Sequence, residues 1–243
     1  MSERPKILAI ETSSRAGSVA LAAGGELLIA RDLPAASRHA NALMPAIGEM
    51  IAEAGWKPAD LEQLYLSIGP GSFTGLRIAV AVARALAQAI EGLRLVAVPS
   101  LNVIAHNAPA EFATVLPVLD AKRGQVFTSL YRREAQGGLS EIAPPRLTTP
   151  AAILEQALAR GAPVALLGEG VDYHRECFPA AGGDARLVEL PRELWVPRAA
   201  VVHRLGYARA LRGAFTPAGA LVPTYLRLPE AEEVYRRKHD LPL

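Results

Sequence analysis

The sequence predicts an α/β protein made of two related lobes, each built on a mixed β-sheet that helices cover. Short apolar runs typical of strands alternate with longer segments in which apolar residues recur at helical spacing. A strand that ends in a carboxylate, followed by a turn and a second strand, occurs near residue 11 and again near residue 120. Hydrophobic residues make up 51% and charged residues 21% of the 243 residues, which is typical of a globular chain.

The first three strands are expected to form a meander. Two apolar runs, Lys6–Glu11 and Ser18–Ala23, flank a polar turn at residues 12–17. Gly24 and Gly25 then supply the positive-φ positions of a tight hairpin that leads into Glu26–Asp32.

Two helices and two further strands complete the predicted first lobe. Residues 41–54 carry apolar side chains at helical spacing, and Gly55 marks the C-terminal stop. Pro45 fits only in the first turn of this helix or at a kink, so the start of the helix stays open. The elements that follow are a buried strand at residues 64–68, a long helix at residues 74–90 and a strand at Arg94–Val98.

The second half repeats the opening pattern. The apolar run at residues 116–120 ends in Asp120, as the first strand ends in Glu11, and Gly124 precedes a strand at residues 125–131. A boundary near residues 107–110 then divides the chain into lobes of residues 1–108 and 109–243. The later elements expected are a helix at residues 151–160, a strand at Val164–Leu167 and a helix at residues 199–212, with loops at Pro144, Pro145 and Pro150.

Composition excludes several classes of protein. No apolar run reaches the roughly 20 residues that span a bilayer, and residues 1–6 contain no apolar signal segment. Cys177 is the only cysteine, which excludes an internal disulfide and a thiolate metal cluster. The net charge of +2 is too balanced to steer the whole molecule onto a phosphate backbone. We expect a cytoplasmic protein, and a solvated tail is favoured over an RNA or partner contact for the cluster of Arg236, Arg237 and Lys238.

The segment GPGSFTGLR, residues 69–77, stands between a predicted strand and a predicted helix. Gly69, Gly71 and Gly75 permit tight turning and close approach of the backbone, and Ser72 or Thr74 can cap the helix. The free N–H groups of a helix N-terminus favour an anion, but the glycine spacing is not that of a Walker loop and no GK[ST] follows. A tight turn with a helix cap is therefore favoured over a phosphate cradle.

Several segments resemble the TsaB family and its larger relative TsaD. ILAIETS at residues 7–13 is similar to the opening strand of both, and GPGSFTGLRI at residues 69–78 resembles the TsaB signature almost letter for letter. Further matches are SRHANALMP (37–45), VPSL (98–101), LDAKRGQVF (119–127) and PTYLR (223–227). The resemblance spans nearly the whole chain in the expected order, and the glycine segment is its most specific part.

This resemblance implies a fold of two ribonuclease-H-like lobes in the superfamily of actin, Hsp70 and sugar-kinase ATPases. It also implies a part in making threonylcarbamoyladenosine in tRNA. TsaC or its relative, TsaD and TsaE make threonylcarbamoyl-AMP from threonine, bicarbonate and ATP and transfer its threonylcarbamoyl group. The acceptor is the adenosine just after the anticodon of tRNAs that read codons beginning with adenine. The implied role is that of a non-catalytic partner of TsaD and TsaE, which meets tRNA only through the complex and can form a homodimer in isolation.

The histidines depart from the pattern of the catalytic relative. A metal pair on a helix needs two imidazoles about one turn apart, as in HxxxH. His39 stands at the first position, but Leu43 stands at the second, and the other histidines are scattered. The sequence also lacks HExxH, so a metallopeptidase, the third functional class considered, is disfavoured. We expect no metal ligands and no catalytic residues in this chain.

Glu11 and Asp120 are the carboxylates that could face a nucleotide. In the ATPase relatives, acids at these two strand ends help to hold a magnesium–nucleotide complex, and Mg²⁺ prefers oxygen ligands. Together with Gly69, Gly71 and Ser72 they form the candidate nucleotide-binding set, although the interpretation that each acid caps the N–H groups of a turn is favoured. No cofactor is expected to be tightly bound, with ATP or ADP possible at the partner interface.

An ATP-dependent small-molecule kinase or ATPase of the same fold is the alternative function. It is weakened because the second lobe shows no recognisable adenosine-binding GG segment. The nearest candidate is the GEG of residues 168–170, and Gly182 and Gly183 are expected in a loop.

Two helices have more apolar surface than one sheet requires. On residues 74–90 the polar residues follow a single stripe that begins at Arg77, and alanines would let another helix approach closely. We expect residues 41–54 and 74–90 to form a helix–helix interface with TsaD or a second copy; the alternative is internal packing. Which face of each helix points outward is open. The candidate interface residues are Leu43, Met44, Ile47, Met50, Ile51, Leu76, Ala79, Val80, Ala83, Leu86 and Ala87.

Overall fold

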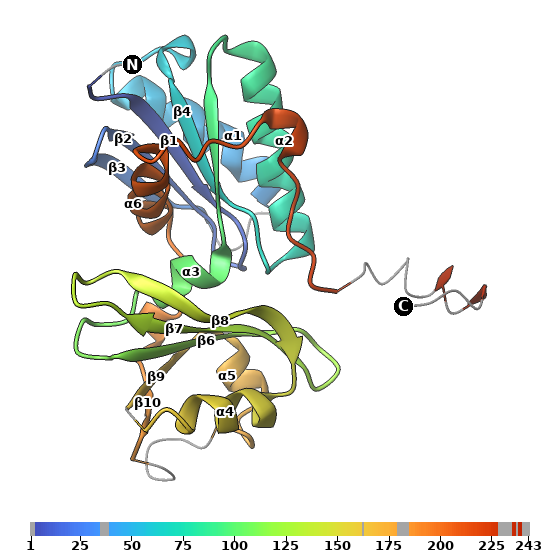
Figure 1. The fold of residues 1–243 in the computed structure, drawn as a ribbon. Coiled ribbons are helices and arrows are strands. Elements are labelled where there is room, and N and C mark those ends of the chain that lie inside the picture. Colours follow the sequence, from blue (N-terminus) through green and yellow to red (C-terminus); the bar gives the residue numbers. More distant parts are fainter. Residues whose placement is uncertain are drawn as a thin grey trace.

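The computed structural model describes residues 3–34, 39–161, 163–178, 185–227, 235–236 and 238–239. Two five-stranded sheets lie one above the other in Figure 1, each with helices packed on its faces. Both sheets are mixed, as the sequence predicted.

The first sheet has the strand order β3-β2-β1-β4-β5. Strands β1, β2 and β3 form the predicted antiparallel meander, and β4 and β5 run parallel to β1. Gly24 takes a φ of +57° in the turn between β2 and β3. The strands are β1 (Lys6–Glu11), β2 (Ser18–Ala23), β3 (Glu26–Asp32), β4 (Gln63–Ser67) and β5 (Arg94–Val98).

The second sheet repeats this topology in the order β10-β9-β6-β7-β8. Strands β6, β7 and β8 form an antiparallel meander, and β9 and β10 run parallel to β6. The predicted internal repeat is therefore confirmed, and the fold is α/β with two mixed sheets of the same topology. The strands are β6 (Thr114–Asp120), β7 (Val126–Arg133), β8 (Leu139–Thr148), β9 (Val164–Leu167) and β10 (Leu187–Glu189).

The stretch that contains Pro144 and Pro145 was wrongly predicted to be a loop, since both lie in β8. β8 is the edge strand of its sheet, where a residue without an N–H need not break a ladder hydrogen bond. The pairing of β7 with β8 shifts register between Thr128 and Tyr131.

Six α-helices and three short 3₁₀ turns accompany the sheets in the described residues. Pro45 lies inside α1, past its first turn. The helices are α1 (His39–Glu53), α2 (Phe73–Ala89), α3 (Ser100–Ala105), α4 (Pro150–Leu158), α5 (Gly170–Tyr173) and α6 (Ala199–Ala210), and the 3₁₀ turns are η1 (Pro58–Asp60), η2 (Arg192–Leu194) and η3 (Ala218–Ala220). None of the helices within the described ranges is long and apolar enough to cross a membrane.

Each face of the first sheet is covered by different helices (Figure 1). α1 and α2 pack on the face that carries Leu8 and Leu66. α6 packs on the opposite face, which carries Ala9 and Tyr65. α6 thus lies in the range predicted as the second lobe but makes its contacts with the first sheet, and the boundary at residue 108 stays a prediction.

A buried histidine joins α6 to the hairpin of the first sheet. His203 is 3% exposed, and its Nε2 donates to the carbonyl oxygen of Gly24 at 2.8 Å. Its ring stacks between Tyr65 and Tyr207. Burial lowers the pKa of His203, and the bond to Gly24 opposes that shift in part.

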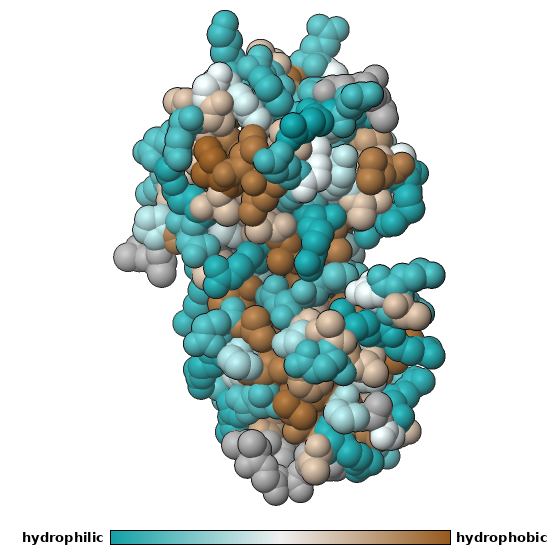
Figure 2. All heavy atoms as spheres, turned by 90° about the vertical axis from the view of Figure 1, so that its left-hand side faces the viewer, coloured by the Kyte–Doolittle hydropathy of each residue, from teal (hydrophilic) through white to brown (hydrophobic). Residues whose placement is uncertain are grey.

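The chain passes between the lobes twice, and polar side chains hold the crossings together. Asn107 Nδ2 donates to the carbonyl oxygens of Leu194 and Val196, each at 2.9 Å. Arg133 donates to the backbone carbonyls of residues 108, 109, 112 and 137 at 2.9–3.2 Å. Seen from the side of β3, the surface is mostly hydrophilic with separate apolar patches (Figure 2).

Candidate functional site

The glycine segment joins β4 to α2 and packs against the turn that follows β1. A Cβ atom at Gly71 would lie 2.3 Å from the carbonyl oxygen of Ser13, and one at Gly75 would lie 1.9 Å from that of Thr12. The Thr12 hydroxyl donates to the carbonyl oxygen of Gly75 at 2.8 Å. The glycines are therefore required because two backbones touch, and the prediction of a tight turn is confirmed.

Three N–H groups at the start of α2, those of Ser72, Gly75 and Leu76, have acceptors within the chain. Ser72 N–H donates to the carbonyl oxygen of Ser13 at 2.6 Å, and the Ser72 hydroxyl caps the helix by accepting from Gly75 N–H at 3.3 Å. Leu76 N–H donates to Ser72 O at 2.9 Å. The backbones of this segment and of the β1 turn are in contact, as the favoured interpretation of a tight turn with a helix cap requires, and binding of a phosphate here stays a prediction.

Glu11 and Asp120 occupy equivalent places in the two lobes and make equivalent bonds. Glu11 Oε1 accepts from the Ser13 N–H at 2.5 Å, and Asp120 Oδ1 accepts from the Lys122 N–H at 3.0 Å. Glu11 is wholly buried. The favoured interpretation, that each acid caps a turn, is confirmed by these two bonds, and a role of Glu11 and Asp120 toward a nucleotide stays a prediction.

The GEG of residues 168–170 is the counterpart of the glycine segment in the second lobe. It follows the parallel strand β9, as residues 69–71 follow β4. A Cβ atom at Gly168 would lie 2.3 Å from the carbonyl oxygen of Val118, and one at Gly170 would lie 2.9 Å from Asp120 N. Close packing on β6 explains these glycines, which the sequence had offered as an adenosine contact.

A group of charges lies where the equivalent turns of the two lobes face each other. His174 Nε2 lies 3.1 Å from Asp120 Oδ1. The carboxyl group of Glu169 lies nearby. Burial of this group and the negative charge of Asp120 raise the pKa of Glu169, and the positive charges of Arg15 and Lys122 oppose that shift. The sequence did not predict the pairing of Asp120 with His174, because no motif spacing joins residues 54 positions apart.

Most of the candidate interface residues face the core of this chain, which corrects the expectation that they form a partner surface. Eight of them are at most 6% exposed: Leu43, Ile47, Met50, Ile51, Leu76, Ala79, Val80 and Ala83. All of these except Leu76 belong to the core that packs on the first sheet. Met44 is 46% exposed, and Leu86 and Ala87 are half-buried. The small or apolar residues exposed on the two helices include Met44, Gly48 and Ala52 on α1 and Ala81 and Ala85 on α2, and charged residues such as Glu49 and Glu53 are exposed beside them.

An aromatic cluster that the sequence did not predict lies at the start of α2. The Arg77 guanidinium lies 3.7 Å from the ring centre of Phe73, and its Nε donates to the Tyr225 hydroxyl at 3.0 Å. The rings of Phe73 and Tyr225 lie 5.1 Å apart. Both motifs, GSFTGLR and PTYLR, were recognised, but no periodicity brings residue 225 to residue 73.

Some expectations fall on residues that the structure does not describe. Arg237, Gly182 and Gly183 lie outside the described residues, as does the side chain of His39. Among the described residues, no three His, Cys, Asp or Glu side chains are arranged to hold a metal ion.

Comparisons with known proteins give one consistent answer. Residues 33–234 match the family model described as TsaD, tRNA N6-adenosine threonylcarbamoyltransferase. The tRNA threonylcarbamoyladenosine biosynthesis protein TsaB of Bacillus subtilis is 30% identical over 93% of this chain and 96% of its own length. TsaB of Escherichia coli is 27% identical over 91% of this chain and 94% of its own.

Solved structures agree with the sequence comparison. YeaZ from Pseudomonas aeruginosa superposes with a TM-score of 0.76 at 27% identity, over 91% of this chain and all of its own. A second structure, of a Pseudomonas aeruginosa protein described as similar to peptidase YeaZ, gives a TM-score of 0.78 at 29% identity, over 92% of this chain and all of its own. The 30% identity to the Bacillus subtilis TsaB protein over 93% of this chain, together with the match of residues 33–234 to the TsaD family model, shows that this chain belongs to the TsaB (YeaZ) family.

Proposed function

We propose that this chain is a non-catalytic partner subunit in the synthesis of threonylcarbamoyladenosine in tRNA. In this proposal TsaD performs the transfer to the adenosine next to the anticodon, and TsaE and this chain support it. The observation that carries the proposal is the 30% identity to a TsaB protein over 93% of the chain. The role belongs to the tRNA-modification complex rather than to the isolated chain.

The residue at position 43 supports a role without metal chemistry. A second imidazole of a helical pair would stand there, one turn after His39. Leu43 is instead wholly buried in the core between α1 and the first sheet. The position supplies an apolar anchor for α1, so the helix offers packing where the catalytic relative would offer a ligand.

The glycine segment supports the same role. Its close contacts with Thr12 and Ser13 fix the start of α2 against β1, and the N–H groups of Ser72 and Gly75 have acceptors within the chain. These contacts favour a scaffold over the alternative of an ATP-dependent kinase or ATPase. Binding of a nucleotide at the interface with a partner is still a prediction. It is tested by comparing the rate of ATP hydrolysis by the isolated chain with the rate of hydrolysis by the complex.

The outer face of α1 and α2 is the surface that we assign to TsaD or to a second copy. Met44 and the small residues Ala81 and Ala85 are exposed on helices that pack against each other. A partner helix can approach small side chains closely, and the burial of Met44 adds a hydrophobic contribution.

Titration calorimetry against TsaD from the same organism tests this surface. Met44→Asp and Ala85→Glu each place an unpaired charge in the contact, and we expect each to weaken binding at least roughly 30-fold, about 2 kcal/mol. Ala151→Glu makes the same change at an exposed position of α4 and should bind TsaD normally. Unchanged affinity in both folded outer-face variants would place the partner surface elsewhere.

A reconstituted reaction tests the division of labour. Threonylcarbamoyl-AMP and unmodified tRNA are incubated with this chain alone, with TsaD and TsaE alone, and with all three. We expect the modified nucleoside in quantity only from the full mixture. Its formation by this chain without TsaD would overturn the assignment.

A further inference from the structure

The cluster of Phe73, Arg77 and Tyr225 presents flat groups at the surface. Phe73 is 37% exposed and Tyr225 is 40% exposed. Arg77 is exposed and lies against the Phe73 ring. The hydrogen bond from Arg77 to the Tyr225 hydroxyl ties the tail to α2, so the two rings are held in place in the free chain.

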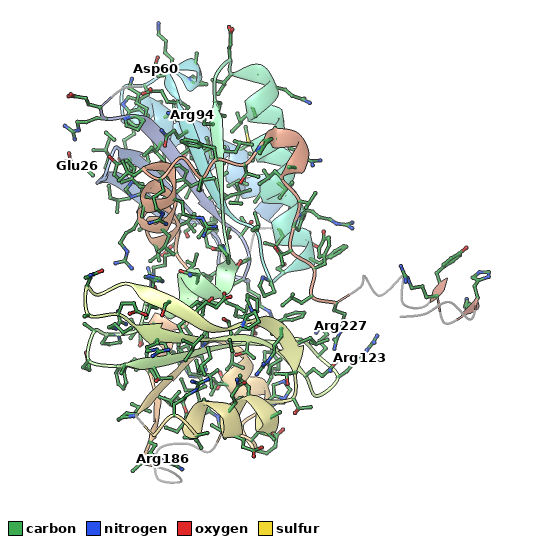
Figure 3. The ribbon with its side chains drawn as sticks, viewed as in Figure 1. Glu26, Asp60, Arg94, Arg123, Arg186 and Arg227 are labelled. Atoms are coloured by element: carbon green, nitrogen blue, oxygen red, sulfur yellow. The ribbon has the colours of Figure 1, made fainter. Side chains whose placement is uncertain are left out.

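Cationic side chains continue the surface toward the second lobe. Arg227 follows Tyr225 by two residues, so their Cα atoms lie at most about 7.6 Å apart. Its guanidinium donates to Ala121 O and to Gln125 Oε1, in the turn between β6 and β7. The same turn exposes Lys122 and Arg123. Figure 3 shows Arg123 and Arg227 close together where the tail leaves the body of the protein.

Exposed ring faces combined with a cationic rim match the chemistry of a single-stranded nucleic acid. Unpaired bases stack on aromatic rings and on guanidinium planes, and their phosphates are attracted to Lys and Arg. Asp120 and Glu169 are the acids beside this rim, and the basic residues Arg15, Lys122, Arg123 and Arg227 outnumber them. A protein partner bound through apolar contacts would instead favour aliphatic neighbours around the rings.

We propose that Phe73, Arg77 and Tyr225 form a stacking site for an unpaired base of an RNA loop, whose phosphates lie along Lys122, Arg123 and Arg227. The choice of RNA rests on the proposed function, in which the complex acts beside an anticodon. The chain would then contact tRNA directly, rather than only through its partners.

Fluorescence anisotropy with labelled RNA tests the site. The probes are an RNA hairpin that carries the anticodon loop of a tRNA reading a codon beginning with adenine, and a blunt duplex of the same length. Each is titrated with the full chain and with its mixture with TsaD. We expect Tyr225→Leu and Phe73→Leu to weaken hairpin binding about tenfold, because leucine has no ring face.

Two matched variants separate stacking from charge. Tyr225→Phe keeps the ring but removes the hydroxyl that accepts from Arg77, so it should weaken hairpin binding less than Tyr225→Leu does. Arg227→Ala should weaken both probes alike and reduce the salt dependence of binding by about one phosphate contact. Tyr173→Leu changes a 51% exposed tyrosine of α5, on the face of the second sheet turned away from the first (Figure 1), and should bind as the unaltered chain does.

Three results overturn the inference. In the first, the hairpin binds neither the chain nor its mixture with TsaD. In the second, the hairpin binds no better than the duplex, and the leucine variants bind the hairpin as the unaltered chain does. In the third, the leucine variants keep their affinity for RNA and lose their affinity for TsaD, in which case the cluster is a protein contact. TsaD affinity is measured separately for every variant. Loss of RNA binding alone therefore supports the site, while failure of the unaltered chain to bind TsaD counts against the proposed function only.

Discussion

Replacing Gly75 by alanine should destabilise the protein through a single backbone contact. The new Cβ would lie 1.9 Å from the carbonyl oxygen of Thr12, whereas an ordinary contact begins at 3.4 Å. The start of α2 must therefore move away from β1 by about 1.5 Å, which is the difference between these distances. That movement breaks the Thr12–Gly75 bond at 2.8 Å and the Ser72–Ser13 bond at 2.6 Å.

The magnitude follows from these losses. Two hydrogen bonds contribute about 1 kcal/mol each, and overpacking costs about 1–3 kcal/mol. Gly75 lies in a helix, where alanine recovers at most about 1 kcal/mol. The net loss should be about 2–4 kcal/mol, a large part of the roughly 5–15 kcal/mol that stabilises a typical domain.

Urea denaturation followed by circular dichroism measures this loss. Gly48→Ala in α1 is the matched control, because nothing lies within 4 Å of its added Cβ. Since Gly48 is inside a helix, alanine there should stabilise the protein by about 0.5–1 kcal/mol. If Gly75→Ala lowered the free energy of unfolding by less than about 0.5 kcal/mol, the contact would not be the reason for the glycine.

Three further predictions concern residues that stabilise the two lobes. Because the folded state lowers the pKa of His203, the unfolded chain binds a proton there more readily below about pH 6.5, and the free energy of unfolding should decrease by up to about 1.4 kcal/mol for each pH unit lost. In urea titrations between about pH 5 and 7, His203→Gln should make the free energy of unfolding depend less on pH, and an equal dependence in both proteins would refute the assignment. Arg133→Lys should cost about 1–3 kcal/mol of unfolding free energy, because an ammonium group cannot serve four carbonyls in the plane of a guanidinium; a urea midpoint equal to that of the unaltered chain would contradict this. Gly206→Ala should lower the thermal midpoint, because the new Cβ would lie 2.5 Å from the Tyr65 ring; a midpoint unchanged or raised would show that the ring moves aside freely.

Local signals in the sequence were sufficient for the strands and the repeat. Apolar runs that end in Glu11 and Asp120 predicted β1 and β6, and the paired turn glycines predicted the hairpin. The signals are local because each depends on neighbours along the chain. The local signals at β8 were misleading, because Pro144 and Pro145 indicate a loop unless the strand is known to lie at the edge of a sheet.

These local signals could not predict which elements pack against each other across the chain. The apolar side chains of α1 and α2 were recognised, but periodicity does not tell a face on the chain's own sheet from a face on a partner. Burial of Leu43 and Ala83 and exposure of Met44 decide that question. Likewise, the meeting of Phe73 with Tyr225 depends on the path of the tail, which no spacing encodes.

The return of α6 to the first sheet has a consequence for synthesis on the ribosome. Strands β1 to β5 emerge about 100 residues before α6, which at 5–20 residues per second is a delay of roughly 5–20 s. During that interval the sheet face that carries Ile7, Tyr65 and Val96 lacks α6. A nascent chain exposes there the kind of apolar surface that chaperones bind, and a chain cut before residue 199 should aggregate although every strand of its first sheet is complete.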